Sequence, residues 1–223
     1  MSDLTVVYYT ANVIPDNFAK KVRQTLRDAT DDYIIAVSKK PIAFGENIVV
    51  DTPRSHISIY RDALTGVKAA KTKYIALAED DVLYSPEHFK YRPTDGVFAY
   101  NLGTWNVHTW GDKMFHHKPS GRRCMHSLIC ERDLFIEAME ERFARHPEGT
   151  DPSIWGEPGK YEQHLRVTVR PTEVFYSNPP NIIFIHETAL GFGHLGKRKR
   201  VGEFRAIEVP WWGRAEEIIK EYS

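Results

Sequence analysis

The apolar and polar positions along the first half of the chain follow two alternating periods. Short runs rich in β-branched and aromatic residues predict strands that are buried on both faces. The segments between them carry apolar residues at helical spacing and predict amphipathic helices. The expected strands are residues 4–10, 33–37, 47–50 and 74–78, and the expected helices are residues 15–29 and 55–70. Strands that alternate with helices form parallel βαβ units, so the pattern predicts an α/β sheet covered on both faces.

The second half of the chain is less regular. Strands are expected over 96–102, 124–130 and 182–185, a helix over 131–145, and a loop rich in Pro and Gly over 146–161. No segment is long or polar enough to mark a linker between domains. We therefore expect a single domain over 1–223, in which about 1–95 bind a nucleotide and about 96–223, with a basic C-terminal loop, bind an acceptor.

Composition and charge narrow the function classes. The chain of 223 residues is 42% hydrophobic with a formal net charge of zero, so no global field holds it on nucleic acid or on an anionic membrane. Two cysteines, Cys124 and Cys130, do not make a disulfide framework. No apolar run approaches the ~20 residues that span a bilayer, and the N-terminus lacks a signal-peptide pattern. We expect a cytoplasmic protein without a membrane span.

A run of three acids interrupts the apolar strand predicted over 74–78. The three acids are Glu79, Asp80 and Asp81. They follow the predicted strand directly, and apolar residues resume at Val82. Adjacent carboxylates repel one another and do not belong near a core without a counter-charge. Mg²⁺ and Mn²⁺ prefer carboxylate oxygens and share them with substrate phosphates. Ligands of α/β sheets bind beyond the carboxyl ends of strands, so the run predicts a metal–phosphate site, with an exposed acidic turn as the alternative.

A wider segment, residues 55–89, resembles the middle of GT-A-fold glycosyltransferases, especially the family-two type. A helix precedes the strand, the acids follow it, and Tyr84-Ser85-Pro86 comes after them, as around the DxD motif of that family. The resemblance covers about the first hundred residues. It implies a mixed, mainly parallel GT-A sheet and a nucleotide-sugar donor, a UDP-sugar before others. By the same resemblance Asp81 binds Mn²⁺ or Mg²⁺, Asp80 supports the metal or the donor sugar, and Glu79, which replaces an Asp, contacts the ribose.

The resemblance also implies residues outside the acidic run. The loop after the first strand would cradle the base, a late histidine would complete the metal shell, and a basic residue near it would hold the diphosphate. Either His186 or His194 suits the metal, and His194 is preferred because Gly196 and Lys197 follow it. The expected donor-binding residues are Thr10, Ala11, Asn12, Lys39, Arg61, Glu79, Asp80, Lys197 and Arg198, and the expected metal ligands are Asp81, Asp80, His194 and His186.

Inverting sugar transfer needs a carboxylate that takes the proton of the acceptor hydroxyl. Family relatives carry a Gly-rich, Trp-containing loop followed by an acidic pair, and here the pair reads Glu162-Gln163. Glu162 is the expected base and Glu157 the second choice. A retaining enzyme would not need this base, and the lone acid leaves both mechanisms open.

Metal-dependent glycosyl transfer to an unidentified acceptor is therefore the leading hypothesis, with a glycan or a modified DNA base among the acceptors. A nucleotidyltransferase of related fold is the alternative enzyme, although residues 10–15 lack the Gly-rich basic loop that such enzymes usually carry. A non-catalytic nucleotide- or glycan-binding protein is the third hypothesis. The intact acidic run argues against it.

Overall fold

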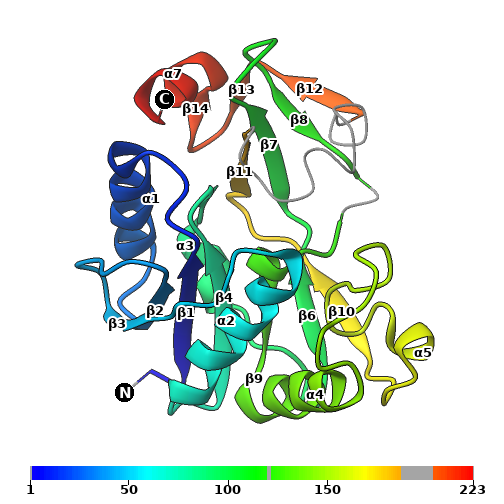
Figure 1. The fold of residues 1–223 in the computed structure, drawn as a ribbon. Coiled ribbons are helices and arrows are strands. Elements are labelled where there is room, and N and C mark those ends of the chain that lie inside the picture. The colour runs from blue at the N-terminus through cyan, green and yellow to red at the C-terminus, as the bar shows by residue number, and fades with distance from the viewer. Residues whose placement is uncertain (1, 120–121, 187–202, 223) are drawn as a thin grey trace.

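A seven-stranded sheet forms the centre of the protein (Figure 1), in a computed structural model that describes residues 2–119, 122–186 and 203–222. All neighbouring strands are parallel except β9, which runs antiparallel to both of its neighbours. The prediction of a mixed, mainly parallel α/β sheet is confirmed. The strand order is β10 (Thr172–Phe175), β6 (Phe98–Asn101), β9 (Leu128–Glu131), β4 (Tyr74–Glu79), β1 (Leu4–Thr10), β2 (Tyr33–Ser38) and β3 (Glu46–Val49).

Helices cover both faces of this sheet, as predicted. Alternate residues of β1 point to opposite faces, so Val7 joins one core cluster and Val6 the other. The first cluster includes residues of α2 (His56–Ala69) and α4 (Arg132–Arg145), and the second includes Leu26 of α1 (Asp16–Ala29). Every residue of β1 is buried, which explains why its residues are β-branched, aliphatic or aromatic and none is charged.

A second sheet of five strands lies beside the first, with α1 and α7 (Ala215–Tyr222) packed on it. Phe18 of α1 contacts Phe184 edge to face, with ring centroids 4.9 Å apart. Only residues 182–185 of this sheet were expected as a strand. Its strand order is β12 (Phe204–Ala206), β8 (Phe115–His117), β7 (Thr104–His108), β11 (Asn181–Ile185) and β5 (Val82–Leu83). Among the described helices, none is long and apolar enough to cross a bilayer.

The two sheets meet at the acidic run. Strand β4 belongs to the central sheet and ends at Glu79, and β5 begins three residues later in the second sheet. Strand β11 pairs with β5 in the antiparallel sense, and the Phe184 amide donates to the Asp81 carbonyl over 2.8 Å. This junction places the end of β11 next to the carboxyl end of β4.

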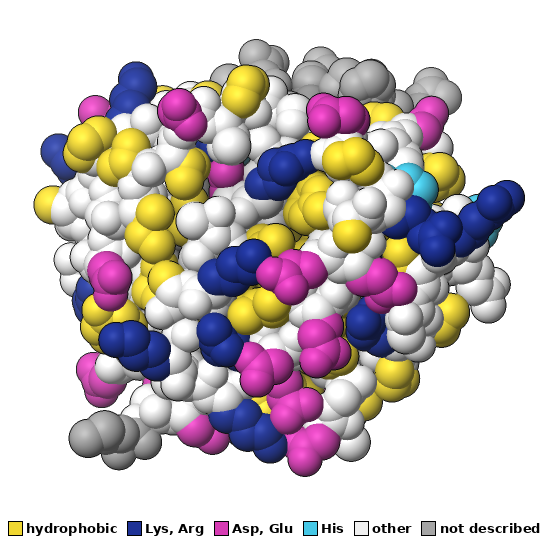
Figure 2. Space-filling model, turned by 60° about the horizontal axis from the view of Figure 1, so that its bottom comes forward, with side chains coloured by type: hydrophobic (Ala, Val, Ile, Leu, Met, Phe, Trp, Pro, Cys, Tyr) yellow, Lys and Arg dark blue, Asp and Glu magenta, His cyan; other side chains and the backbone are white. Residues whose placement is uncertain are grey.

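The opposite end of β4 has a different character. A hollow of about 560 Å³ there is lined mostly by charged side chains of both signs, among them Lys73, Glu131 and Arg132. Figure 2 shows the side of the molecule at the bottom of Figure 1, where acidic and basic side chains are interspersed. No acid of the run from Glu79 to Asp81 lines this hollow, so the chemistry of the acids belongs to the other sheet edge.

Candidate functional site

The first two acids of the run are held by hydroxyl groups of the neighbouring strand. Strand β1 pairs with β4 so that Tyr9 lies opposite Glu79. The Tyr9 hydroxyl donates to Glu79, and the Thr10 hydroxyl donates to Asp80. The parallel register of two central strands therefore fixes two carboxylates at one edge of the sheet.

Tyr84 holds the turn after β4 from below. Its buried hydroxyl accepts a hydrogen bond from the Glu79 amide over 3.1 Å and donates to the His126 carbonyl over 3.0 Å. The tyrosine that follows the acids by three residues thus connects their turn to the segment before β9. This contact gives a structural reason for the spacing between the acids and Tyr84.

Asp81 lies beside one of the two predicted histidines. The His186 Nε2 atom is 3.3 Å from Asp81 Oδ2. The other oxygen, Asp81 Oδ1, is buried and has no hydrogen-bond partner among the described residues. The remaining predicted residues of the C-terminal loop, His194, Lys197 and Arg198, lie outside the described residues.

Burial and mutual repulsion disfavour the charged forms of the first two acids. Burial raises the pKa of Glu79 to about 8, and the charge of Asp81 adds to the shift. Burial likewise raises the pKa of Asp80 to about 6, again with a contribution from Asp81. The hydrogen bonds from Tyr9 and Thr10 oppose these shifts without cancelling them. Glu79 and Asp80 therefore lack sufficient positive charge around them.

These features fit a divalent cation. A buried carboxylate oxygen without a partner is costly unless it meets a donor or a cation, and a cation would relieve the repulsion between the acids. Carboxylate oxygen and neutral imidazole nitrogen are both suitable ligands for Mn²⁺. Within residues 2–119, 122–186 and 203–222, however, no three His, Cys, Asp or Glu side chains converge on one point. Among the described residues, Asp81 and His186 are thus the two that could contribute to holding a cation at this edge.

The loop after β1 is built around Asn12. This residue adopts a left-handed conformation with φ of 54°, which Asn tolerates better than most side chains. Its Oδ1 accepts hydrogen bonds from the amides of Lys39 at 2.8 Å and Lys40 at 3.0 Å, and its own amide donates to the Thr10 hydroxyl at 2.9 Å. The structure therefore brings Thr10, Ala11, Asn12 and Lys39 together beside the acids.

The Lys39 side chain is occupied by a buried network that the sequence did not reveal. Its Nζ lies 2.6 Å from Asp62 Oδ2 and also donates to Thr52, and the Thr52 hydroxyl donates to Asp62 Oδ1. Asp62 is on the inner side of α2 and is 7% exposed. An acid on the apolar side of the predicted helix was the available signal for this network. Its partner, Lys39, comes from a loop distant in the sequence and could not be inferred from that signal.

Arg61, predicted to bind the donor, is directed elsewhere. Its guanidinium lies over the Phe143 ring, 4.6 Å from the ring centroid, and donates to the Pro147 carbonyl. It lines a hollow of about 420 Å³ together with Lys68 and Glu140. Arg61 therefore joins α2 to α4 and to the loop that follows, and a role in donor binding does not fit this placement.

Glu162, the expected base, is also engaged in structure. The Arg142 guanidinium is fully buried and lies 2.5 Å from Glu162 Oε1, which also accepts from the Gly159 amide. The same guanidinium donates to the Gly156 carbonyl at 2.5 Å. Arg142 and Glu162 thus hold the loop before α5 (Glu162–Leu165) in place, because a buried charge is stable only when it is paired and hydrogen-bonded.

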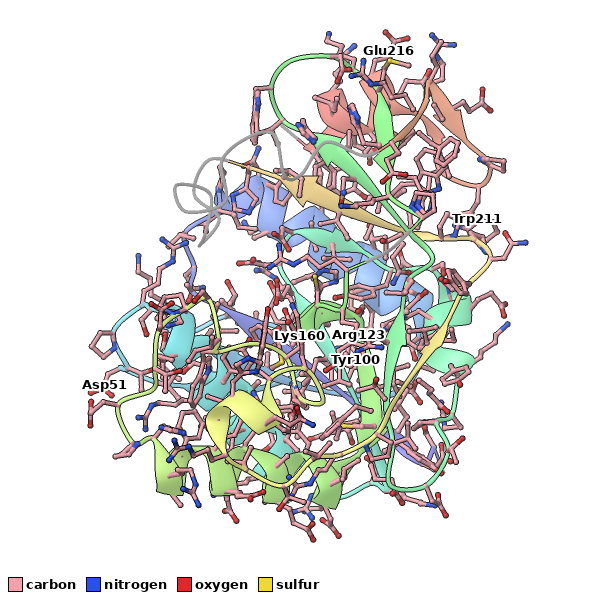
Figure 3. The ribbon with its side chains drawn as sticks, turned by 90° about the vertical axis from the view of Figure 1, so that its right-hand side faces the viewer. Asp51, Tyr100, Arg123, Lys160, Trp211 and Glu216 are labelled. Atoms are coloured by element: carbon pink, nitrogen blue, oxygen red, sulfur yellow. The ribbon has the colours of Figure 1, made fainter. Side chains whose placement is uncertain are left out.

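Glu157, the second choice, lies in the loop before α5. Its side chain is nearly buried and pairs with Lys160 over 3.2 Å. The charge of Glu157 adds to the raised pKa of Glu79, and with burial it raises the pKa of Cys124 to about 12. Figure 3 labels Lys160 and Tyr100, and the Tyr100 hydroxyl fixes the loop that carries Glu157 by donating to the Pro158 carbonyl over 2.6 Å. The charge of Glu157 is therefore close enough to the acidic run to influence Glu79.

Comparisons with known proteins identify transferases of similar shape. No family model and no curated protein matches the sequence. A nucleotidyl transferase from Methanothermobacter thermautotroptrophicus matches at a TM-score of 0.46 and 15% identity, covering 79% of this chain and 88% of that chain. A glycosyltransferase involved in the glycosylation of the major capsid of PBCV-1 matches at a TM-score of 0.46 and 11% identity. This match covers 81% of this chain and 92% of that chain. S. aureus TarS in complex with UDP-GlcNAc matches at a TM-score of 0.47 and 9% identity. This match covers 83% of this chain and 59% of that chain. TM-scores below 0.5 do not decide the function of this chain.

Proposed function

We propose that this protein is a metal-dependent glycosyltransferase that moves a sugar from a nucleoside-diphosphate sugar to an acceptor hydroxyl. The observation that carries the proposal is the buried edge at which Asp81, with one unpartnered oxygen, lies beside His186. The loop built on Asn12 borders the same edge, and in this proposal it would bind the nucleoside. A sheet edge with acids and a neighbouring polar loop is where α/β folds bind nucleotides.

The metal in this proposal is Mn²⁺ or Mg²⁺. Asp81 and His186 would hold it, and Asp80 would support it, with donor phosphates as the remaining ligands. When bound, such a cation stabilises the negative charge that develops on the departing diphosphate. Thr10 and Tyr9 keep Asp80 and Glu79 in position for this purpose through their hydroxyl groups.

The acceptor side of the proposal uses Glu157. In an inverting transfer the acceptor oxygen forms a bond to the anomeric carbon while the bond from that carbon to the phosphate oxygen breaks. The nucleoside diphosphate leaves with the bonding electron pair, and the acceptor proton passes to a carboxylate. Glu157 replaces Glu162 in this role because Glu162 is bound to Arg142. Lys160 holds the Glu157 carboxylate over 3.2 Å.

The proposal is tested by measuring the release of nucleoside diphosphate. The protein is incubated with a panel of nucleoside-diphosphate sugars, UDP-sugars first, with and without Mn²⁺. We expect metal-dependent release of nucleoside diphosphate, which Asp81→Asn abolishes. Asp95→Asn is the matched control, because Asp95 is exposed and pairs with Lys73 far from the site. Release of pyrophosphate from a nucleoside triphosphate and a sugar phosphate would identify a nucleotidyltransferase instead, and release of neither product would contradict both.

A further inference from the structure

The segment before β9 approaches the acidic run because β9 and β4 are antiparallel. Ala76 of β4 lies opposite Ile129, so the positions that follow Ala76 run alongside the positions that precede Ile129. The short 3₁₀ helix η1 (Met125–Ser127) occupies those positions and packs against β4. Helix η1 therefore lies at the carboxyl end of β4, which is where Glu79 begins the run of acids.

His126, the central residue of η1, is tied to the acids through its backbone. The Tyr84 hydroxyl bridges the Glu79 amide, over 3.1 Å, and the His126 carbonyl, over 3.0 Å. His126 is only 7% exposed, and burial lowers the pKa of its imidazole, whereas the charges of Asp81 and Glu157 both oppose that shift. The ring is therefore close enough to be influenced by the candidate metal ligand and by the candidate base.

The fold leaves part of this imidazole unused. Its Nδ1 atom is buried and has no hydrogen-bond partner among the described residues. A buried polar atom without a partner costs free energy, so at a candidate active site it indicates a group that binds substrate. The lowered pKa of His126 favours the neutral ring, which offers one donor and one acceptor. A hydroxyl group also donates and accepts, so it matches this ring better than a phosphate, which favours cations.

The proposed reaction indicates which hydroxyl groups the ring would meet. The cation at Asp81 would hold the diphosphate, and Glu157 would activate the acceptor hydroxyl. The transferred sugar must lie between these two points, because its anomeric carbon leaves one oxygen and joins the other. We infer that His126 binds a hydroxyl group of the transferred sugar and contributes to the choice of donor. This inference rests on the proposed function and specifies its sugar-binding position.

The test compares nucleotide sugars with the nucleotides that they contain, by calorimetry on the full chain with Mn²⁺. The probes are UDP-glucose, UDP-N-acetylglucosamine and GDP-mannose, with UDP and GDP as references. We expect at least one of the three sugars to bind. His126→Phe keeps a ring but removes its nitrogen atoms, so it should weaken that nucleotide sugar about tenfold and change the Kd of the nucleoside diphosphate by less than about twofold. His126→Asn should retain part of the difference, since an amide also donates and accepts.

Ser127→Ala is the matched control within η1. The Ser127 hydroxyl donates to the Cys124 carbonyl over 2.9 Å, so the variant disturbs the same helix without removing the imidazole. It should leave the ratio of the two Kd values unchanged, and a change like that of His126→Phe would overturn the inference in favour of a general disturbance of η1.

Two further outcomes of the His126→Phe measurement would overturn the inference. Equal weakening of the nucleotide sugar and its nucleoside diphosphate would assign the imidazole to the metal or the diphosphate, and no weakening of either would exclude it from the site. A wild-type protein that binds none of the probes with Mn²⁺ gives a different result, because it would contradict the proposed function itself and the inference with it.

A melting curve without ligand separates binding from folding. Phe fills the space of the imidazole and leaves no buried nitrogen without a partner, so His126→Phe should melt at the same temperature as the wild type or at a higher one. A clear fall in the melting temperature would show that the imidazole supports the fold, and it would remove the argument from the unpartnered nitrogen.

Discussion

The imidazole of His186 lies 3.3 Å from the carboxylate of Asp81, although 105 positions separate the two residues in the chain. Strand pairing between β5 and β11 creates this proximity, and the hydrogen bond from the Phe184 amide to the Asp81 carbonyl secures it. Asp81 follows a strand of the central sheet, and His186 follows a strand of the second sheet. The candidate metal site therefore depends on how the two sheets are joined.

This relationship leads to a prediction for His186→Ala. The variant loses the imidazole but keeps Asp81, so we expect the affinity for Mn²⁺ in the presence of UDP to fall about tenfold or more, since removing a ligand weakens a partial shell strongly. Calorimetric titration with Mn²⁺ measures this affinity. His164→Ala is the control, because His164 is an exposed residue of α5. Unchanged Mn²⁺ affinity in His186→Ala would exclude this imidazole from the metal shell.

The raised pKa of Glu79 predicts how stability depends on pH. The ordinary pKa of a glutamate side chain is 4.5, and the pKa of Glu79 in the folded protein is about 8. The unfolded chain loses this proton first, so the contribution of Glu79 to the free energy of unfolding is present below about pH 4.5 and is lost as the pH rises to about 8. Glu79→Gln removes the ionisation and can still accept from Tyr9. We expect this variant to melt at a higher temperature than the wild type at pH 8 and at a similar one at pH 4.5, by calorimetry without metal.

The same titration predicts competition between protons and the metal. Protonation of Asp80, whose pKa is about 6, and of Glu79 lowers the negative charge at the site. Mn²⁺ should therefore raise the melting temperature more at pH 8 than at pH 6, because binding at the lower pH must displace protons. Equal stabilisation at both pH values would indicate that the cation binds away from these acids.

Most of the central sheet and the acidic edge could be predicted from sequence because both depend on local patterns, whereas the outer strand β10 was not expected. An apolar strand followed by three carboxylates is visible in residues 74–81, and the loop at Asn12 follows a strand of the same kind. The second sheet was largely missed, since β5 has two residues, β8 has three, and the five residues of β7 lie in a segment dense in Trp and His. Short strands carry too little periodicity to be separated from loops.

Side-chain direction explains the errors within the site. Arg61 and Asp62 are neighbours on one helix, yet Asp62 points inward to Lys39 and Arg61 points to Phe143. Successive helical residues lie about 100° apart around the axis, so a motif near a helix does not reveal which of its residues reaches the site. Glu162 was expected to be the base, and its ion pair with Arg142 was not foreseen, because Arg142 comes from another helix.

Asn12 offers a prediction about the loop after β1, the proposed nucleoside-binding loop. Asn12→Ala removes the acceptor for the Lys39 and Lys40 amides and places Ala at a φ of 54°, which Ala adopts less readily than Asn. We expect a loss of about 1–3 kcal/mol in the free energy of unfolding and weaker UDP binding. Urea denaturation and calorimetry measure the two effects. Asn12→Gly permits the backbone conformation without the hydrogen bonds, so it should lose less stability; an equal loss would assign the whole effect to the hydrogen bonds.

Variants of Glu157 and Glu162 distinguish a role in catalysis from a role in folding. Glu162→Gln leaves the Arg142 charge buried without its counter-charge, so we expect the free energy of unfolding to fall by about 3 kcal/mol, as is usual for one partner of a buried ion pair. Glu157→Gln keeps the shape and leaves Lys160, which is partly exposed, to be solvated. Its stability should change by less than about 1 kcal/mol, while kcat for sugar transfer should fall by a factor of roughly 10² to 10⁴.

Denaturation in urea measures the free energy of unfolding of both variants. A steady-state assay measures their kcat, with the donor that the product-release experiment identifies. The pH profile adds a readout that a structural role would not affect, because a general base must be ionised to act and the acidic limb of kcat should disappear in Glu157→Gln. If Glu162→Gln folds as stably as the wild type and loses activity, the two assignments are reversed. If both variants retain full kcat, neither carboxylate is the base, and the retaining mechanism that the lone acid at Glu162 leaves open becomes the better account of the transfer.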